Sequence, residues 1–199
     1  MGLLDSLRAM LGTSAETDAT RAADPDDLFG MSTAYLTMAA DLGFDPSGEA
    51  ALCFSNVDSA SFEQAEQEVK EILEAGREET GTEASFNTDS HGYQWVILED
   101  PEFEDLITSM HFAADTFVEK GFGSRLLAAV FAFEKDSPVY WVYSFRRGSY
   151  YPFAPQSGHE RDSTTEFKLQ STLDGELDVE DETDHWYPLW PDGRGHPWE

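Results

Sequence analysis

The chain has 199 residues, and its 40 acidic against 12 basic residues give a formal net charge of −28. This charge argues against nucleic-acid binding through a broad basic surface and against simple electrostatic adsorption to anionic lipid. Hydrophobic residues nevertheless make up 40% of the chain, which suffices for the core of a single folded domain.

The acidic residues are spread along the whole chain, while only four residues are lysine. At molar ionic strength the Debye length falls to about 3 Å, so repulsion between these carboxylates is largely screened. We therefore interpret the charge as an adaptation to a cytosol of high salt concentration. A local acidic function, such as cation binding or mimicry of DNA, is the alternative interpretation.

The single cysteine, Cys53, lies in an apolar run and is predicted to be a buried thiol rather than a nucleophile. No apolar stretch has the 18 or more residues of a membrane span. The start of the chain also lacks the pattern of a signal peptide. These observations lead us to expect a cytoplasmic protein.

Residues 1–12 are predicted to form an amphipathic helix, followed by a polar and acidic linker over residues 13–27. Five apolar side chains fall on one face of this helix: Leu3, Leu4, Leu7, Met10 and Leu11. So short a helix is marginal in water and needs a surface to fold against. That surface is either its own domain or a partner, with peripheral contact to a membrane as a further option.

The next segments alternate between helix and strand patterns. Residues 28–42 have a spacing compatible with a helix, and residues 50–55 predict a strand. Ser61 begins a capping-box pattern, and the helix that it opens is expected to end near Gly76. Residues 77–91 are interpreted as a polar connection.

A strand of the buried type is predicted at residues 93–98. Asp100 followed by Pro101 has the pattern of an N-cap and the first residue of a long helix, which Gly121 is expected to end. The inner face of that helix is expected to carry seven apolar side chains: Phe103, Leu106, Ile107, Met110, Ala114, Phe117 and Val118.

Residues 126–133 and 139–145 predict two strands joined by a short hairpin connection. Residues 162–174 fit a helix that Asp162 or Ser163 caps. In that helix Phe167, Gln170, Leu173 and Leu177 have helical spacing, although Phe167, Leu169 and Ser171 fit strand alternation equally well.

The order of these elements predicts an α+β fold. It is a single domain over residues 28–199, with a largely antiparallel sheet, helices packed on one face and an aromatic C-terminal tail. Residues 178–184 are expected to form a solvated acidic loop, because they lack the glycine and glutamate positions of a calcium loop. Residues 185–199 carry three tryptophans, which are expected to strap across the domain.

Five histidines occur, but none belongs to a recognised metal-binding motif. His111 and Asp115 are four residues apart on the predicted long helix, so a side-chain hydrogen bond is favoured over metal ligation. A metal-dependent enzyme that uses His91, His111 or His159 with nearby carboxylates is retained as the alternative function.

Residues 140–153 form the most aromatic stretch, and it contains two of the eight arginines side by side, Arg146 and Arg147. In one interpretation the aromatic residues fill the core and the arginines pair with nearby acids. In the other, the arginines bind an acidic group of a protein partner, and three aromatic residues anchor the contact: Tyr150, Tyr151 and Phe153.

Four stretches spread over the chain resemble sequences of a known family: Met1 to Leu7, Glu49 to Phe54, Tyr143 to Phe153 and Trp186 to Trp190. Together they resemble the PspA-associated protein family, AB subtype, and its haloarchaeal members in particular. The resemblance implies association with phage-shock protein A, a membrane-remodelling coiled-coil protein of envelope stress. It also implies a gene that lies beside membrane-stress genes, among them that of a membrane metalloprotease of the HtpX type. It implies no catalytic residue and no cofactor.

We therefore expect a non-enzymatic adaptor or regulator of an envelope-stress response that binds a PspA-like coiled coil or an HtpX-type membrane protease. The expected contacts are the Arg146–Arg147 segment and the helix at residues 1–12, through Leu3, Leu4, Leu7 and Leu11. A protein partner is preferred to lipid for this helix, because Arg8 is its only cation. Nucleic acid is not expected as a ligand.

If the charge reflects a salt-rich cytosol, the free energy of unfolding will rise between low and molar KCl, because salt screens the repulsion among carboxylates. Chemical unfolding at a series of KCl concentrations, followed by circular dichroism, measures this dependence. Stability that did not increase with KCl would contradict the interpretation.

Overall fold

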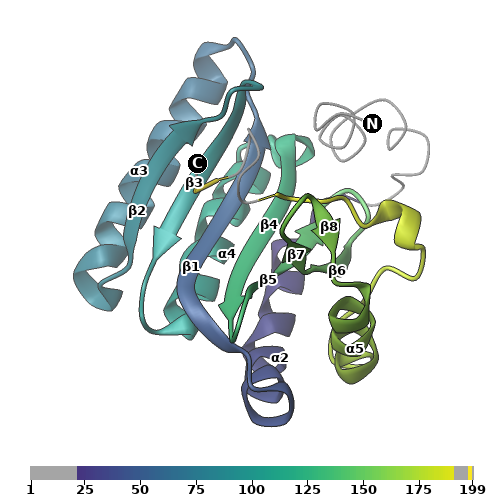
Figure 1. Ribbon diagram of the computed structural model, residues 1–199. Helices are drawn as coiled ribbons and strands as arrows, with labels where there is room; N and C mark the ends of the chain where they lie inside the picture. The colour runs from purple at the N-terminus through teal and green to yellow at the C-terminus, as the bar shows by residue number, and fades with distance from the viewer. Residues whose placement is uncertain (1–21, 191–196, 199) are drawn as a thin grey trace.

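The computed structural model describes residues 22–190 and 197–198, so the predicted helix at residues 1–12 lies outside the described residues. The described chain forms a six-stranded sheet of order β2-β3-β1-β4-β5-β6, in which every neighbouring pair of strands is antiparallel. Helices cover one face of this sheet (Figure 1). The predicted α+β fold with a largely antiparallel sheet is confirmed.

The strands of this sheet are β1 (Asp45–Ser55), β2 (Glu83–Thr88), β3 (Tyr93–Glu99), β4 (Leu126–Glu134), β5 (Pro138–Ser144) and β6 (Ser149–Phe153). A separate short pair consists of β7 (Pro155–Gln156) and β8 (Glu160–Arg161). The helical elements are η2 (Pro25–Gly30), α2 (Met31–Thr37), η3 (Met38–Leu42), α3 (Ala60–Thr80), α4 (Phe103–Glu119), η4 (Gly123–Arg125), α5 (Ser163–Leu173) and η5 (Thr183–His185).

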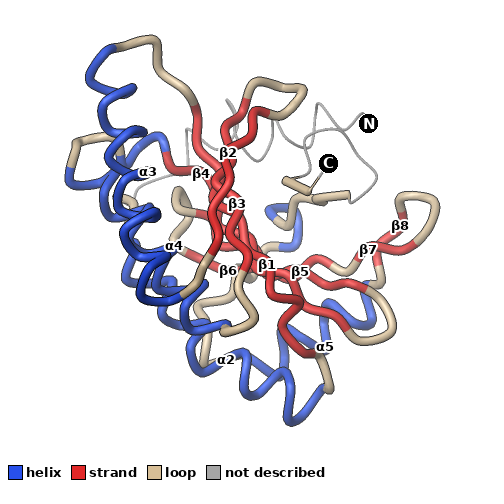
Figure 2. The backbone as a smooth tube through the Cα atoms, turned by 90° about the vertical axis from the view of Figure 1, so that its left-hand side faces the viewer, coloured by secondary structure: helices blue, strands red, loops and turns tan. Residues whose placement is uncertain are grey.

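The central strands carry apolar side chains on both faces of the sheet. In β1, Leu52 and Phe54 belong to the core cluster on the helix side, whereas Ala51 and Cys53 belong to a second cluster on the other side. Both faces therefore need a cover. Figure 2 shows α3 and α4 on one side of the strands and the chain that follows α5 on the other.

The helix-side core is built around the aromatic residues of α4. Phe117 packs against Phe54 of β1 and Phe62 of α3, with ring centroids 4.7 and 5.8 Å apart. Of the seven residues predicted for the inner face of α4, six are buried and Val118 is partly buried. The predicted inner face is therefore confirmed.

Cys53 is completely buried on the opposite side of the same strand. Burial, together with the negative charge of Asp89, raises the pKa of its thiol well above the ordinary value. Thiolate formation is therefore suppressed, and the prediction of a structural core cysteine is confirmed.

Helix α3 begins earlier and ends later than the sequence pattern predicts. Ser59, not Ser61, is the N-cap, and its hydroxyl accepts a hydrogen bond from the N–H of Phe62 at 3.2 Å. The helix runs through Gly76 and ends at Gly81, which adopts a φ of 88°. Glycine adopts this left-handed conformation without the steric cost of a Cβ, so Gly81 is the better stop signal.

Asp100 does not cap α4, contrary to the prediction. The N-cap is Glu102, and its side chain makes no capping hydrogen bond. The buried Asp100 carboxylate instead accepts the N–H of Glu102 at 2.8 Å and the hydroxyl of Thr82 at 2.6 Å. Asp100 thus ties the end of β3 to the start of β2.

The predicted polar connection at residues 77–91 contains a strand that the sequence pattern does not reveal. Strand β2 pairs only with β3 and lies at the edge of the sheet. All but one of its residues are exposed, and the exception, Phe86, is half-buried with Lys70 4.9 Å above its ring. A polar edge strand has little apolar periodicity to detect.

The helical pattern at residues 28–42 is confirmed, as the three consecutive elements η2, α2 and η3. Residues 25–27, assigned to the linker by sequence, form the first half of η2, where Pro25 is buried. The side chain of Asp24 caps this element by accepting the N–H of Asp26 at 3.2 Å.

The helical interpretation of residues 162–174 is confirmed, with Asp162 as the N-cap of α5. The predicted inward face is wrong in one respect, because Phe167 is 51% exposed. The residues of α5 that are buried are Glu166, Leu169 and Leu173. Glu166 is buried because it pairs with an arginine, which a hydrophobic pattern does not indicate.

The chain after α5 covers the second face of the sheet, as the tryptophan content predicts. Trp186 and Leu189 are buried in the second cluster, and Trp198 stacks on Tyr140 of β5 with ring centroids 6.0 Å apart. The expectation of a solvated loop at residues 178–184 is wrong at its start. There, Tyr150 of β6 exchanges backbone hydrogen bonds with Asp178 and Glu180, at 2.7 and 2.8 Å.

Replacing Leu189 by alanine is expected to lower the free energy of unfolding by about 2–3 kcal/mol, because it opens the apolar cover of the second face. Leu36→Ala is the matched control, since Leu36 is 55% exposed, and it is expected to cost less than about 1 kcal/mol. Denaturant unfolding in molar KCl measures both. Equal effects of the two substitutions would contradict a structural role for the tail.

Candidate functional site

The site singled out by sequence lies at the turn between β5 and β6. Its three aromatic residues, Tyr150, Tyr151 and Phe153, are at most 2% exposed. Tyr150 belongs to the helix-side cluster, while Tyr151 and Phe153 belong to the second cluster. The core interpretation therefore holds for all three, and in this fold they are not available as anchors for a partner.

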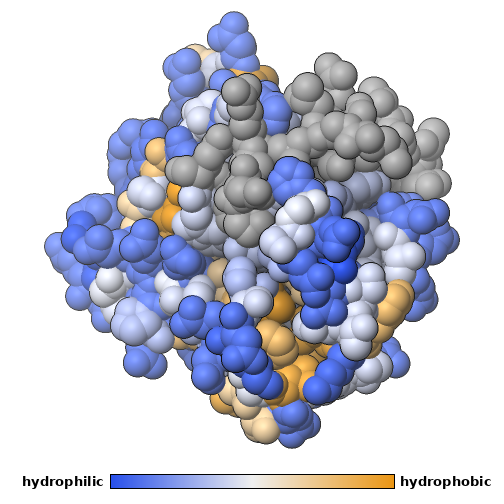
Figure 3. All heavy atoms as spheres, viewed as in Figure 1, coloured by the Kyte–Doolittle hydropathy of each residue, from blue (hydrophilic) through white to orange (hydrophobic). Residues whose placement is uncertain are grey.

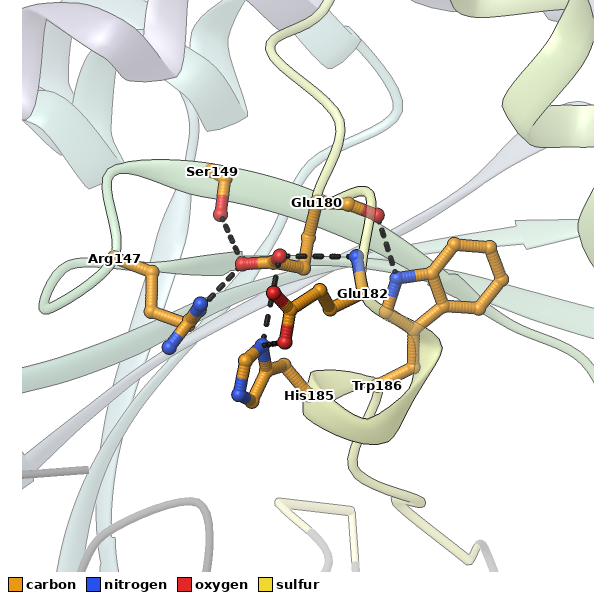
Figure 4. A network of polar contacts seen from close by, with 6 residues as sticks. All are labelled: Arg147, Ser149, Glu180, Glu182, His185 and Trp186. Carbon is orange, nitrogen blue, oxygen red and sulfur yellow. Dashed lines mark hydrogen bonds and ion pairs between the residues drawn. The ribbon is translucent and has the colours of Figure 1, made fainter. Parts of the chain in front are cut away.

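Arg147 is one of the two adjacent arginines, and it pairs with Glu180 (Figure 4). One oxygen of the Glu180 carboxylate accepts hydrogen bonds from Arg147 Nε and, at 3.3 Å, from the Ser149 hydroxyl. The other oxygen accepts the N–H of Glu182 at 3.1 Å and faces Nδ1 of His185 at 3.5 Å. This carboxylate is fully engaged inside the molecule.

The Glu180 side chain remains ionised to lower pH than an ordinary glutamate. Burial alone raises the pKa of its carboxyl, but the hydrogen bonds from Arg147 and Glu182, the charge of Arg147 and the contact with His185 outweigh burial and lower it. The backbone of the same residue accepts the indole N–H of Trp186 at 2.9 Å. Glu180 thus fastens the tail to β6.

A second arginine–glutamate pair fastens the tail at the other end of β6. Arg161 Nε donates to both oxygens of the buried Glu166, at 2.9 and 3.0 Å. The same guanidinium also donates to the backbone carbonyls of Trp186 and Pro152. Arg161 therefore serves the fold, as Arg147 does.

Arg146 differs from its neighbour, because it forms no ion pair or side-chain hydrogen bond with any residue between 22 and 190 or at 197–198. Arg125, at the end of η4, is likewise unpaired within these residues and is exposed. The two lie at the same end of the sheet, since Phe145 N–H donates to the carbonyl of Leu127 at 3.2 Å and extends the β4–β5 ladder toward both.

This arrangement leaves two guanidinium groups at one end of a strongly acidic molecule. A guanidinium has five N–H donors in a planar fork that matches the two oxygens of a carboxylate or phosphate. The chemistry available here is therefore recognition of an anion.

The three histidines of the alternative enzyme hypothesis do not come together. Nε2 of His111 pairs with Asp26 at 2.9 Å rather than with Asp115, as predicted, and His159 stacks on Trp190. His91 lies in the β2–β3 turn, where its N–H donates to Asp89. Within the described parts of the chain, no three histidine, cysteine or acidic side chains are grouped so as to hold a metal ion.

Sequence reasoning missed two residues of this region. Glu180 lies in a run of acids that gives no reason to select one of them, and only the fold shows which carboxylate meets Arg147. Arg125 is 21 residues from Arg146 in the chain, and the register of β4 against β5 brings them to one end. The predicted contact residues Leu3, Leu4, Leu7 and Leu11 lie outside the described residues.

A family model with the description PspA associated protein B matches residues 1–198 of the chain. No curated protein matches it. In the described segments, none of the helices has the length and apolar composition needed to cross a membrane.

Arg147→Gln is expected to lower the free energy of unfolding by about 1–3 kcal/mol at pH 7, because Glu180 then keeps a partly buried charge without its main donor. Arg146→Gln, one position away, is expected to change stability by less than about 0.5 kcal/mol. Denaturant unfolding in molar KCl measures both variants.

The effect of Arg147→Gln also has a defined pH dependence. A carboxyl whose pKa is lowered in the folded state stabilises that state above its unfolded pKa, about 4.3, and this stabilisation is lost as the pH falls through the lowered value. The difference between wild type and Arg147→Gln is therefore expected to shrink below about pH 4. A difference that stayed constant to acid pH would contradict the ion pair.

Proposed function

Because the chain belongs to the PspA associated protein B family, we propose that it is a non-enzymatic adaptor that binds a PspA-like coiled-coil protein in an envelope-stress response. The observation that supports a contact surface is that two arginines at one end of the sheet, Arg125 and Arg146, make no ion pair within residues 22–190 and 197–198. The family match supports the identity of the partner.

The unpaired arginines are unusual because internal partners are abundant. The chain has 40 acidic residues and only eight arginines, so an arginine that serves the fold has many carboxylates with which to pair. Arg147 and Arg161 do so. Arg125 and Arg146 have no acidic partner in the part of the chain that the structure describes, and we propose that each binds an acidic side chain of another protein. Arginine is frequent at the energetic centres of such contacts.

The salt concentration expected for the cell limits how this contact works. In molar salt the Debye length is about 3 Å, so long-range attraction is screened and only close, bidentate pairing retains its strength. Planar guanidinium groups suit that requirement better than lysine ammonium groups do. We therefore expect short-range recognition of carboxylates rather than broad electrostatic steering.

The predicted helix at residues 1–12 is the second proposed contact. Its apolar face, with Leu3, Leu4, Leu7 and Leu11, fits the groove between helices of a coiled-coil partner. Two weak contacts on one chain reinforce each other, because the first engagement raises the local concentration of the second. We propose that this takes place in a salt-rich cytosol, at the inner face of the membrane.

Capture of the PspA-like protein tests the proposal. The tagged full chain is expected to retain a PspA-like protein from a lysate of salt-adapted cells in molar KCl, identified by mass spectrometry. Arg125→Gln with Arg146→Gln is expected to reduce this retention at least about tenfold, as is removal of residues 1–12.

The matched control is Lys135→Gln with Lys168→Gln, which makes the same change in net charge at the β4–β5 hairpin and on α5, at the opposite end of β5 from Arg146. It is expected to retain the partner at the wild-type level. If the unmodified chain retained neither a PspA-like protein nor an HtpX-type membrane protease, the adaptor function would be wrong. Full retention by the arginine variant would contradict the proposed surface alone.

A further inference from the structure

A cavity of about 250 Å³ opens where the η3–β1 connection, the β4–β5 hairpin and the first half of α5 meet. Its wall includes four buried apolar residues: Leu42, Val139, Ala154 and Leu169. Figure 3 has the same viewpoint as Figure 1, and its lower part shows apolar residues among hydrophilic ones beside the position of α5. This cavity lies outside the site already described.

The cavity and the arginine turn lie at opposite ends of β5. Val139, near the start of that strand, borders the cavity, whereas Arg146 follows the end of the strand. Seven residues of extended chain separate the two ends by about 20 Å. A ligand in the cavity therefore does not occupy the surface proposed for the protein partner.

Two of the four lysines in the chain, Lys135 and Lys168, line this one cavity. The ammonium group of Lys135 is held in place, because it donates to the carbonyl of Leu42 at 2.9 Å and lies 5.7 Å from the centre of the Phe44 ring. Lys168, on α5, is exposed and makes no ion pair with any of the described residues. Two of the few cationic side chains of this protein therefore line one cavity, and the ammonium group of Lys168 has no partner among the described residues.

Two carboxylates, those of Asp136 and Asp162, line the cavity as well, so the lysines are balanced in formal charge, and the two kinds of group differ in which hydrogen-bonding atoms are free. Asp162 is committed to capping α5, since its oxygens accept the N–H and the hydroxyl of Thr165 at 3.1 and 2.7 Å. These hydrogen bonds lower the pKa of its carboxyl. Asp136 is exposed on the hairpin and makes no ion pair with a described lysine, so it stays hydrated.

We propose that this cavity binds a small aliphatic carboxylate. Its chain packs against Leu42, Val139 and Leu169, and its carboxylate lies between Lys135 and Lys168 at the mouth. The volume is slightly below the range of about 300–1,000 Å³ that is typical of drug-sized ligands, which fits a short chain. A primary amine in the same place meets two ammonium groups, while the oxygens of Asp162 already accept hydrogen bonds from Thr165, and an uncharged chain offers Lys168 no carboxylate.

Titration calorimetry in molar KCl with three probes of equal chain length tests the proposal: hexanoate, hexanol and hexylammonium. Hexanoate is expected to bind at one site per chain, at least tenfold more tightly than either of the other two. Equal affinity for all three probes, or no binding of hexanoate at millimolar concentration, would overturn it.

Two lysine variants locate the binding. Lys135→Gln with Lys168→Gln is expected to weaken hexanoate binding at least tenfold, while Lys70→Gln with Lys120→Gln, which removes the same charge from the other two lysines, leaves it unchanged. Lys168→Gln alone disturbs no internal ion pair, so it tests the site without risk to the fold, and it is expected to weaken binding severalfold. Hexanoate affinity that survived both cavity variants would overturn the assignment.

Discussion

The sheet is apolar on both faces, and the rest of the structure follows from the need to cover each of them. Helices α3 and α4 cover one face with side chains whose periodicity is plain in the sequence. The other face is covered by an irregular tail, which has no periodicity and therefore needs fastening. Arg147 with Glu180 and Arg161 with Glu166 supply that fastening at the two ends of β6. The aromatic residues of the segment 140–153 therefore lie in or next to the core strands β5 and β6 and do not form an exposed contact surface.

How far sequence predicts this fold depends on whether an element is specified by itself or by its neighbours. Helix α4 and strands β4 and β5 carry their own hydrophobic patterns, and the predictions for them match the structure to within a few residues. Strand β2 has almost nothing to bury, and it exists because β3 offers it a ladder of hydrogen bonds. Asp100 has the local pattern of a helix cap, but its carboxylate accepts a hydrogen bond from the hydroxyl of Thr82 instead of capping α4. In both cases the structure depends on a residue or strand that is distant in the chain, and such partners cannot be identified from a single sequence.

The same distinction explains the candidate site. Arg146 and Arg147 are neighbours with identical side chains, so no local pattern tells which of them is used internally. The answer depends on where Glu180 lies, and that follows from the pairing of the tail with Tyr150. Selecting Glu180 from sequence is not possible when one residue in five is acidic. A resemblance to a family narrows the function in such a case, but it does not divide a run of arginines into structural and available members.

Scarcity of positive charge makes that division informative. Nine basic residues lie in the described segments, 22–190 and 197–198. Six of them have an internal role: Arg77, Arg147, Arg161 and Lys120 pair with carboxylates, Lys70 lies over an aromatic ring, and Lys135 binds a backbone carbonyl. The remaining three are Arg125, Arg146 and Lys168, and each lies at one of the two proposed binding sites. In an ordinary protein an unpaired surface cation carries no information, because lysine and arginine are plentiful. In a chain of net charge −28, carboxylates are plentiful, so a cation that pairs with none of the described ones is not needed by the fold. We propose that such cations bind an external anion.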